Sequence, residues 1–146
     1  MKLLHTAFGL KIKHLNNLIT KKVYALFTND EYPFISHSSF LVIDYLYENK
    51  DHEVTQKDIE KALVINRATT SKMLLLLEQK GFISRMNSTE DARKKIVVLT
   101  ERGHDFRTHN LMKAEELNHF FSEVLSEEDF IAFDRLYEKL RNALEE

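Results

Sequence analysis

The spacing of apolar residues predicts that most of the chain is helical. Between residues 1 and 28 they recur every three or four positions, which is the pattern of one face of an amphipathic helix. The polar run 29–33 should break this helix. Ser36 or Ser38 can cap a second helix, which should end at 49–52. The first stripe comprises Leu4, Phe8, Ile12, Leu15, Leu18, Ile19, Val23 and Leu26.

A closely spaced pair of helices is predicted next. Thr55 is a suitable N-cap for a short helix, and Asn66 for a helix over 67–80 that ends at Gly81. Only two residues lie between the two helices, so they must cross steeply, as in a helix-turn-helix. The inner faces should comprise Ile59, Ala62 and Leu63 on the first helix, and Thr70, Met73, Leu74 and Leu77 on the second.

Beyond Gly81 the pattern becomes that of strands. Residues 82–86 and 95–99 favour β-structure and enclose a polar segment, which predicts a hairpin with a long tip. Thr100 can cap a long helix, and Ser126 with the three acids after it can start a last one. The apolar stripes of these two helices are Phe106, Leu111, Met112, Leu117, Phe120, Phe121 and Val124, then Phe130, Phe133, Leu136, Tyr137, Leu140 and Leu144.

Composition narrows the fold class. The 146 residues suit one domain, and three Gly and one Pro are too few for the turns of an all-β fold. We therefore expect a mainly α fold with a small β-hairpin (α+β). The absence of Cys excludes disulfide frameworks and thiolate catalysis. No apolar run reaches about 18 residues and the start lacks a signal-peptide pattern, so we expect a cytoplasmic protein without a membrane partner.

Charge is distributed unevenly along the chain. The formal net charge is −2, yet residues 55–100 hold nine Lys and Arg against five Asp and Glu. Residues 101–146 hold six basic residues against twelve acidic ones. A basic segment that coincides with the predicted helix-turn-helix is typical of a module that faces nucleic acid, although solvated charge can also vary by chance.

Two motifs resemble those of the MarR (multiple antibiotic resistance regulator) family. Asp91-Ala92-Arg93 followed by 99–103 (LTERG) is similar to the family's D-x-R…L-T-x-x-G, and 77–85 (LEQKGFISR) to its L-E-x-x-G-hydrophobic-hydrophobic-x-R. The sequence departs from the family at three positions. Family members usually have polar residues where this chain has Leu75 and Leu76, and they often have Pro where it has Ala68. The resemblance implies a winged helix-turn-helix flanked by N- and C-terminal dimerisation helices.

The implied organisation is a single domain over 1–146. Its DNA-binding lobe would cover 36–100, and the segments 1–35 and 101–146 would form the dimer. The long apolar stripes agree with this, because a lone monomer would leave them poorly covered.

One face of the helix over 67–80 does not pack on the core and could therefore contact DNA. On a helical wheel Ala68, Thr69 and Lys72 lie opposite the inner face, with Arg67 at the exposed N-terminus. A recognition helix presents its N-terminal part to the major groove. The family's base-contacting positions match the same three residues. The predicted DNA contacts on this helix are Arg67, Ala68, Thr69, Thr70 and Lys72.

The hairpin tip supplies a second set of candidates. In the family the arginine that matches Arg93 enters the minor groove, and the aspartate that matches Asp91 helps to hold the wing. A narrow minor groove attracts arginine electrostatically, and Lys94 and Lys95 could neutralise phosphates. Thr55 and Gln56, at a helix N-terminus, are weaker phosphate candidates.

These observations predict a sequence-specific regulator of transcription that binds double-stranded DNA as a homodimer. We expect a ligand-responsive repressor with a pseudo-palindromic operator. The effector cleft is implied by the resemblance alone, with His14, His37 and Arg107 as its polar groups. The effector, the target genes and repression versus activation stay open.

Three alternative functions agree less well with the sequence. Motifs of common enzyme classes are missing, including the P-loop, G-x-S-x-G and H-E-x-x-H, so neither an enzyme nor a cofactor is expected. A zinc-type regulator of the same fold would need clustered ligands, whereas His104 and His109 do not share a helix face and the E-x-x-H spacing of Glu116 and His119 occurs once. A helical dimer that binds no DNA would not need a basic wing.

Overall fold

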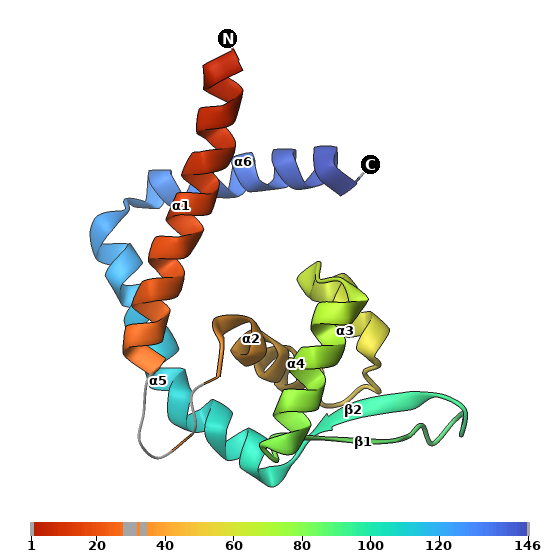
Figure 1. Cartoon of the computed structure of the whole chain (residues 1–146). Helices are drawn as coiled ribbons and strands as arrows, with labels where there is room; N and C mark the ends of the chain where they lie inside the picture. Colours follow the sequence, from red (N-terminus) through yellow and green to blue (C-terminus); the bar gives the residue numbers. More distant parts are fainter. Residues whose placement is uncertain (1, 28–31, 33–34, 146) are drawn as a thin grey trace. The chain divides into compact units, whose positions relative to one another are not determined.

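The computed structural model describes residues 2–27, 32 and 35–145, with side chains from residue 7 onward. It is mainly α with one antiparallel hairpin, as predicted (Figure 1). Contacts divide the chain into two compact units, Met1–Leu111 and Met112–Glu146. The elements are α1 (Lys2–Phe27), α2 (His37–Glu48), α3 (Gln56–Leu63), α4 (Arg67–Gln79), β1 (Ile83–Asn87), β2 (Lys95–Leu99), α5 (Glu101–Val124) and α6 (Glu127–Glu145).

Helices α2, α3 and α4 begin at predicted caps. Ser36, rather than Ser38, caps α2, and its hydroxyl oxygen accepts from the amide of Ser39 at 3.1 Å. Thr55 and Asp58 form a capping box on α3. The side-chain oxygen of Asn66 accepts from the third amide of α4 at 2.8 Å. The predicted break at 29–33 lies outside the described residues, except for residue 32.

The turn between α3 and α4 is tight because Val64 takes the left-handed conformation, with φ 52°. Such a φ is uncommon for a β-branched residue. The inner face of α3 is smaller than predicted: Ile59 is buried and Leu63 half-buried, whereas Ala62 is exposed. The prediction for Ala62 was wrong because α3 packs on its neighbours through the side that carries the other two residues.

The core of the first unit lies between α2, α3, α4 and the hairpin. All four predicted inner residues of α4 are buried, and Leu74 belongs to the same buried apolar cluster as Ile43 and Ile59. Phe82 extends this core towards α5, where its ring centroid lies 4.6 Å from that of Phe106. These contacts fix the inner side of α4 and leave its opposite side exposed.

The hairpin pairs Ile83 with Leu99 and Asn87 with Lys95. Its first strand starts one residue later than predicted because the amide of Phe82 donates to the carbonyl of Leu77, at the end of α4, instead of pairing across the sheet. The hairpin projects beyond the helices of its unit (Figure 1).

Large apolar side chains are exposed on the terminal helices. On α1 they are Phe8, Leu10, Ile12, Leu15, Leu18 and Tyr24. In the second unit they are Met112, Phe120, Val124, Leu125, Phe130, Ile131, Phe133, Leu136, Tyr137, Leu140 and Leu144. Helix α6 has no buried residue within its described length. Among the described residues no helix is both long and apolar enough to cross a membrane.

Candidate nucleic-acid interface

The outer face of α4 carries the side chains predicted for it. Arg67, Ala68, Thr69 and Lys72 are all exposed, and the buried Met73 lies on the other side of the helix. The N-terminal end of α4 is capped by Asn66 and exposed to solvent. This arrangement offers two cations and a hydroxyl, which are groups that can bind base edges and phosphates.

Thr70 is a correction to the predicted set. Its side chain is fully buried, and its hydroxyl donates to the carbonyl of Asn66 at 2.9 Å. It belongs to the inner face of α4, as its position in the apolar pattern also indicated. A buried side chain cannot contact DNA, so Thr70 is removed from the interface.

The side chains of Thr55 and Gln56 make hydrogen bonds within the helix-turn-helix. The hydroxyl of Thr55 donates to the carboxylate of Asp58 at 2.7 Å. The side-chain amide of Gln56 donates to the hydroxyl of Ser71 at 2.8 Å and to the carboxylate of Glu60 at 3.2 Å. These bonds use the side-chain donors of both residues, and the phosphate contacts predicted from their position at the helix N-terminus stay a prediction. Gln56 also fastens α3 to α4.

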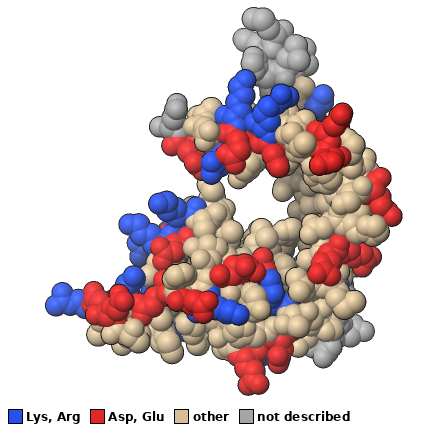
Figure 2. Space-filling view, turned by 180° about the vertical axis from the view of Figure 1, so that it is seen from behind, with Lys and Arg blue, Asp and Glu red and all other residues tan. Residues whose placement is uncertain are grey.

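Asp91 shapes the hairpin tip. Its carboxylate accepts from the amide of Arg93 at 3.0 Å, and its carbonyl accepts from the amide of Lys94 at 2.9 Å. The side chains of Arg93 and Lys94 are exposed by this turn, whereas the ammonium group of Lys95 donates to the side chain of Asn87. Figure 2 shows the projecting hairpin ending in basic side chains next to acidic ones.

Glu53 anchors the hairpin and was not predicted from the sequence. It lies before α3, yet its carboxylate accepts from the hydroxyl of Ser88 and, at 2.9 Å each, from the amide and hydroxyl of Thr89. The Ser88 hydroxyl in turn accepts from the amide of Glu90 at 3.1 Å. The bond from Ser88, followed by those from Thr89, lowers the pKa of Glu53. No local pattern links residues this far apart in the sequence.

The anchor can be tested by removing its carboxylate. Glu53→Ala should expose the Thr89 amide to rapid hydrogen exchange, because that amide loses its acceptor, while the core of the unit stays folded. Glu90→Ala, which removes an acid from the same hairpin, is the matched control and should leave Thr89 protected. Since the pKa of Glu53 is lowered, the anchor should persist at neutral pH. It should open only when the pH falls below the ordinary range of a glutamate. Equal protection of Thr89 in both variants would contradict this role.

Residues in the segment 99–103 form a junction that joins α4, the hairpin and α5. The hydroxyl of Thr100 donates to the carbonyl of Gly81 and accepts from the amide of Gly103 at 3.1 Å. The amide of Thr100 donates to the carbonyl of Phe82 at 3.0 Å. Gly81 has φ +78°, so it ends α4 in a conformation that suits glycine. The junction fixes the end of α4 and the start of α5 to each other.

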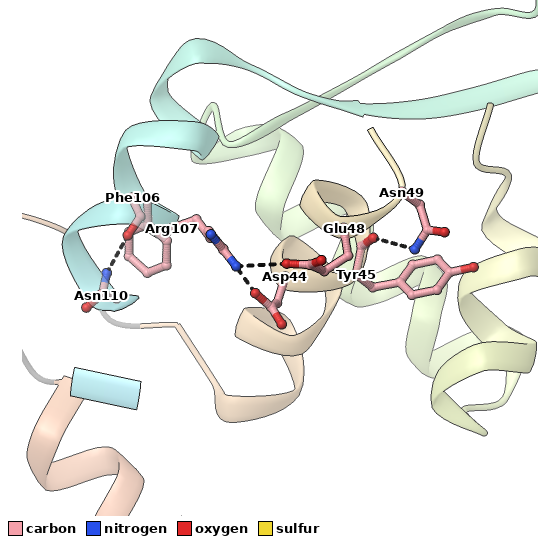
Figure 3. A network of polar contacts seen from close by, with 7 residues as sticks. All are labelled: Asp44, Tyr45, Glu48, Asn49, Phe106, Arg107 and Asn110. Atoms are coloured by element: carbon pink, nitrogen blue, oxygen red, sulfur yellow. Dashed lines mark hydrogen bonds and ion pairs between the residues drawn. The ribbon is translucent and has the colours of Figure 1, made fainter. Parts of the chain in front are cut away.

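Arg107 belongs to a structural network on α2 (Figure 3). Its guanidinium donates to Asp44 and to Glu48, each at 3.0 Å, and lies 3.8 Å from the ring centroid of Tyr47. These contacts occupy the guanidinium, so the predicted role of Arg107 as an effector ligand is not supported.

The other two predicted effector residues differ in their surroundings. His14 is exposed on α1, whereas His37 is half-buried at the start of α2, where burial lowers its pKa. Asn110, on α5, is buried, and its side-chain oxygen has no partner among the described residues.

Within the described part of the chain no three His, Cys, Asp or Glu residues form a group that could hold a metal ion.

Comparisons with known proteins agree with this geometry. The model of the MarR family matches residues 35–95. The repressor YetL of Bacillus subtilis is 33% identical over 69 residues, 47% of this chain and 41% of its own length. The uncharacterised regulator YdgJ of the same organism is 32% identical over 110 residues, 74% of this chain and 65% of its own length. This chain thus covers less than two thirds of either relative.

The fold has a close structural counterpart. The Staphylococcus aureus protein MepR, in its complex with DNA, superposes with a TM-score of 0.83 at 24% identity. The match covers 93% of this chain and 97% of that one. A helix-turn-helix followed by a hairpin between long terminal helices defines a winged helix protein. Residues 35–95 of this chain are similar to the MarR family, the family that its motifs at 77–85 and 91–103 resemble.

Proposed function

We propose that the chain is a transcription regulator that binds double-stranded DNA, with the outer face of α4 in the major groove and Arg93 in the minor groove. The observation that carries this proposal is the exposed N-terminal face of α4 on the same lobe as a basic hairpin tip. The relatives support it, since YetL is a repressor and the MepR structure contains DNA.

The regulator is proposed to act as a homodimer. Exposed apolar side chains on α1 and α6 need a cover, and a second copy of the chain supplies the same stripes. A two-fold dimer presents two recognition helices and therefore selects a pseudo-palindromic operator with half-sites about one helical turn apart. Because its relatives come from bacteria, where the chromosome lies in the cytoplasm, the proposed location is the cytoplasm.

Control by a small molecule is a further part of the proposal. The side-chain oxygen of Asn110, which is buried and has no partner in the described part of the chain, is an acceptor that a ligand with a hydrogen-bond donor could satisfy. It replaces Arg107 as the candidate polar group on α5. A ligand would release DNA only if it bound the DNA-free conformation of the dimer more tightly.

Selection of DNA from a random duplex library tests the proposed function. The full chain should enrich an inverted repeat and bind it in fluorescence anisotropy as one dimer, with sedimentation giving the mass of two chains. A variant with Lys72→Glu and Lys94→Glu should sediment identically and enrich nothing. Failure of the unaltered chain to enrich any sequence would refute the proposal.

Arg93 should contribute to affinity without contributing to stability. Arg93→Ala should weaken operator binding by roughly 1–3 kcal/mol if the side chain enters the groove. The unfolding midpoint should stay unchanged, because the side chain is exposed at a turn. Anisotropy at moderate salt and a thermal melt measure the two effects. An unaltered affinity would remove Arg93 from the interface.

Thr69 and Lys72 should contribute to specificity, in contrast to Lys94. Changing either of the first two to Ala should reduce the ratio of operator affinity to random-duplex affinity, because base contacts carry sequence information. Lys94→Ala should weaken both affinities about equally, as expected of a phosphate contact. If all three variants lowered the two affinities in parallel, α4 would not be reading bases.

A further inference from the structure

The exposed face of α4 continues beyond the residues predicted to contact DNA. Leu75 follows Ala68 by two helical turns, so both lie on the same side of the helix. The side chain of Leu75 is 51% exposed, and that of its neighbour Leu76 is 42% exposed. The other apolar residues in this stretch, Met73, Leu74 and Leu77, are buried. The core therefore leaves an apolar patch, Leu75 with Leu76, on the outside of α4.

The position of this patch indicates which surface it meets. With a rise of about 1.5 Å per residue, Leu75 lies about 12 Å along the helix from Arg67. That length corresponds to three or four base-pair steps of roughly 3.4 Å. The patch adjoins Lys72 on the same face and so continues the proposed DNA interface. The large apolar stripes suited to a second copy lie instead on α1 and α6.

The chemistry of leucine limits what it can bind there. A leucine side chain cannot donate or accept hydrogen bonds, so it contributes nothing to phosphate or polar base edges. The apolar group that the major groove offers is the C5-methyl group of thymine. We infer that Leu75, flanked by Leu76, is a specificity-determining apolar subsite that packs on thymine methyl groups in each half-site. This inference rests on the proposed DNA binding.

Replacing thymine by uracil tests the subsite directly, because it removes the methyl group alone. Duplexes would be selected from a random library by the full chain, and each thymine of the enriched sequence would be changed in turn to deoxyuridine. At one or two thymines per half-site the affinity of the unaltered protein should fall about three- to five-fold, the effect of one buried methyl group. Leu75→Ala alters both protomers of the dimer, so it should bind the unsubstituted duplex more weakly by about the square of that factor, roughly 10- to 25-fold. It should also no longer respond to those substitutions.

Leu41→Ala provides the matched control. Leu41 is 40% exposed on α2, outside the outer face of α4, so its loss should alter neither affinity nor the response to uracil. A scan without any sensitive thymine, or a Leu75→Ala protein that keeps full sensitivity, would overturn the subsite while leaving the proposed DNA binding intact. A changed sedimentation mass for Leu75→Ala would assign the patch to a second copy of the chain instead. Failure to select any duplex would overturn both the apolar subsite and the proposed DNA binding.

Discussion

A chain that lacks residues 127–146 should lose high-affinity operator binding, although its recognition helix and hairpin are intact. Helix α6 has large exposed apolar residues and no buried one within its described length, so we expect it to contribute to the dimer. Without the dimer the two half-sites are bound independently. The loss of linked binding corresponds to roughly 10²- to 10⁴-fold in affinity. Sedimentation should show monomers or aggregates, and anisotropy the weakened binding.

The matched control keeps α6 and alters only its polar side. Arg141→Ala removes an exposed ion pair with Glu138 without touching the apolar stripe. Exposed pairs contribute little to stability, so this variant should dimerise and bind as the unaltered chain does. A truncated chain that still sedimented as a dimer and bound its operator normally would show that α6 is not part of the interface.

Gly103→Ala should be among the most destabilising single changes in the first unit. A Cβ at this position would overlap the carbonyl oxygen of Phe82 and approach Leu99 to 3.0 Å. That carbonyl accepts the hydrogen bond from the amide of Thr100, so it cannot retreat without breaking the junction between α4 and α5. Overpacking of this kind costs about 1–3 kcal/mol, and more where the neighbour is backbone. Urea unfolding should show the loss as a lower midpoint.

Gly9→Ala distinguishes this clash from a general effect of adding a methyl group. Gly9 also lies in a helix, and a Cβ there meets nothing within 4 Å. Because alanine favours helix over glycine by roughly 0.5–1 kcal/mol, this variant should be as stable as the unaltered chain or more so. If Gly103→Ala unfolded at the same urea concentration as Gly9→Ala, the junction would tolerate the methyl group.

Local chemistry made the helices predictable. Ser36, Thr55 and Asn66 have side chains that can accept from the first turn of a helix, and each does so where the pattern placed a start. The outer face of α4 was predictable as well. Its apolar residues recur with the helical period, and the residues opposite this buried face must be exposed. The strand boundary was displaced by one residue because the amide of Phe82 completes the end of α4.

Interactions between distant parts of the chain could not be predicted. The attachment of Glu53 to Ser88 and Thr89, and the pairing of Arg107 with α2, join elements whose mutual placement is decided by packing. Thr70 was assigned both to the inner face and to DNA because its residue type suits either, and burial decides for the inner face. The bond from Gln56 to Ser71 could not be predicted for a related reason, because the two residues are fifteen positions apart in the sequence.

The attachment of the hairpin also constrains the order in which the lobe folds. An isolated two-stranded hairpin is marginally stable in water. Here it gains support from the segment before α3, where Glu53 holds the polar tip and the carbonyl of Val54 accepts from the amide of Val97 at 2.7 Å. That segment is itself positioned only once α2 and α3 have docked. The polar tip should therefore form late in folding and open early under denaturing conditions, whereas the strands, which bury Ile83 and Val97 in the core, should stay folded with the helices. Substitutions in the polar tip are thus free to alter DNA preference with little risk to the folding of the helical core.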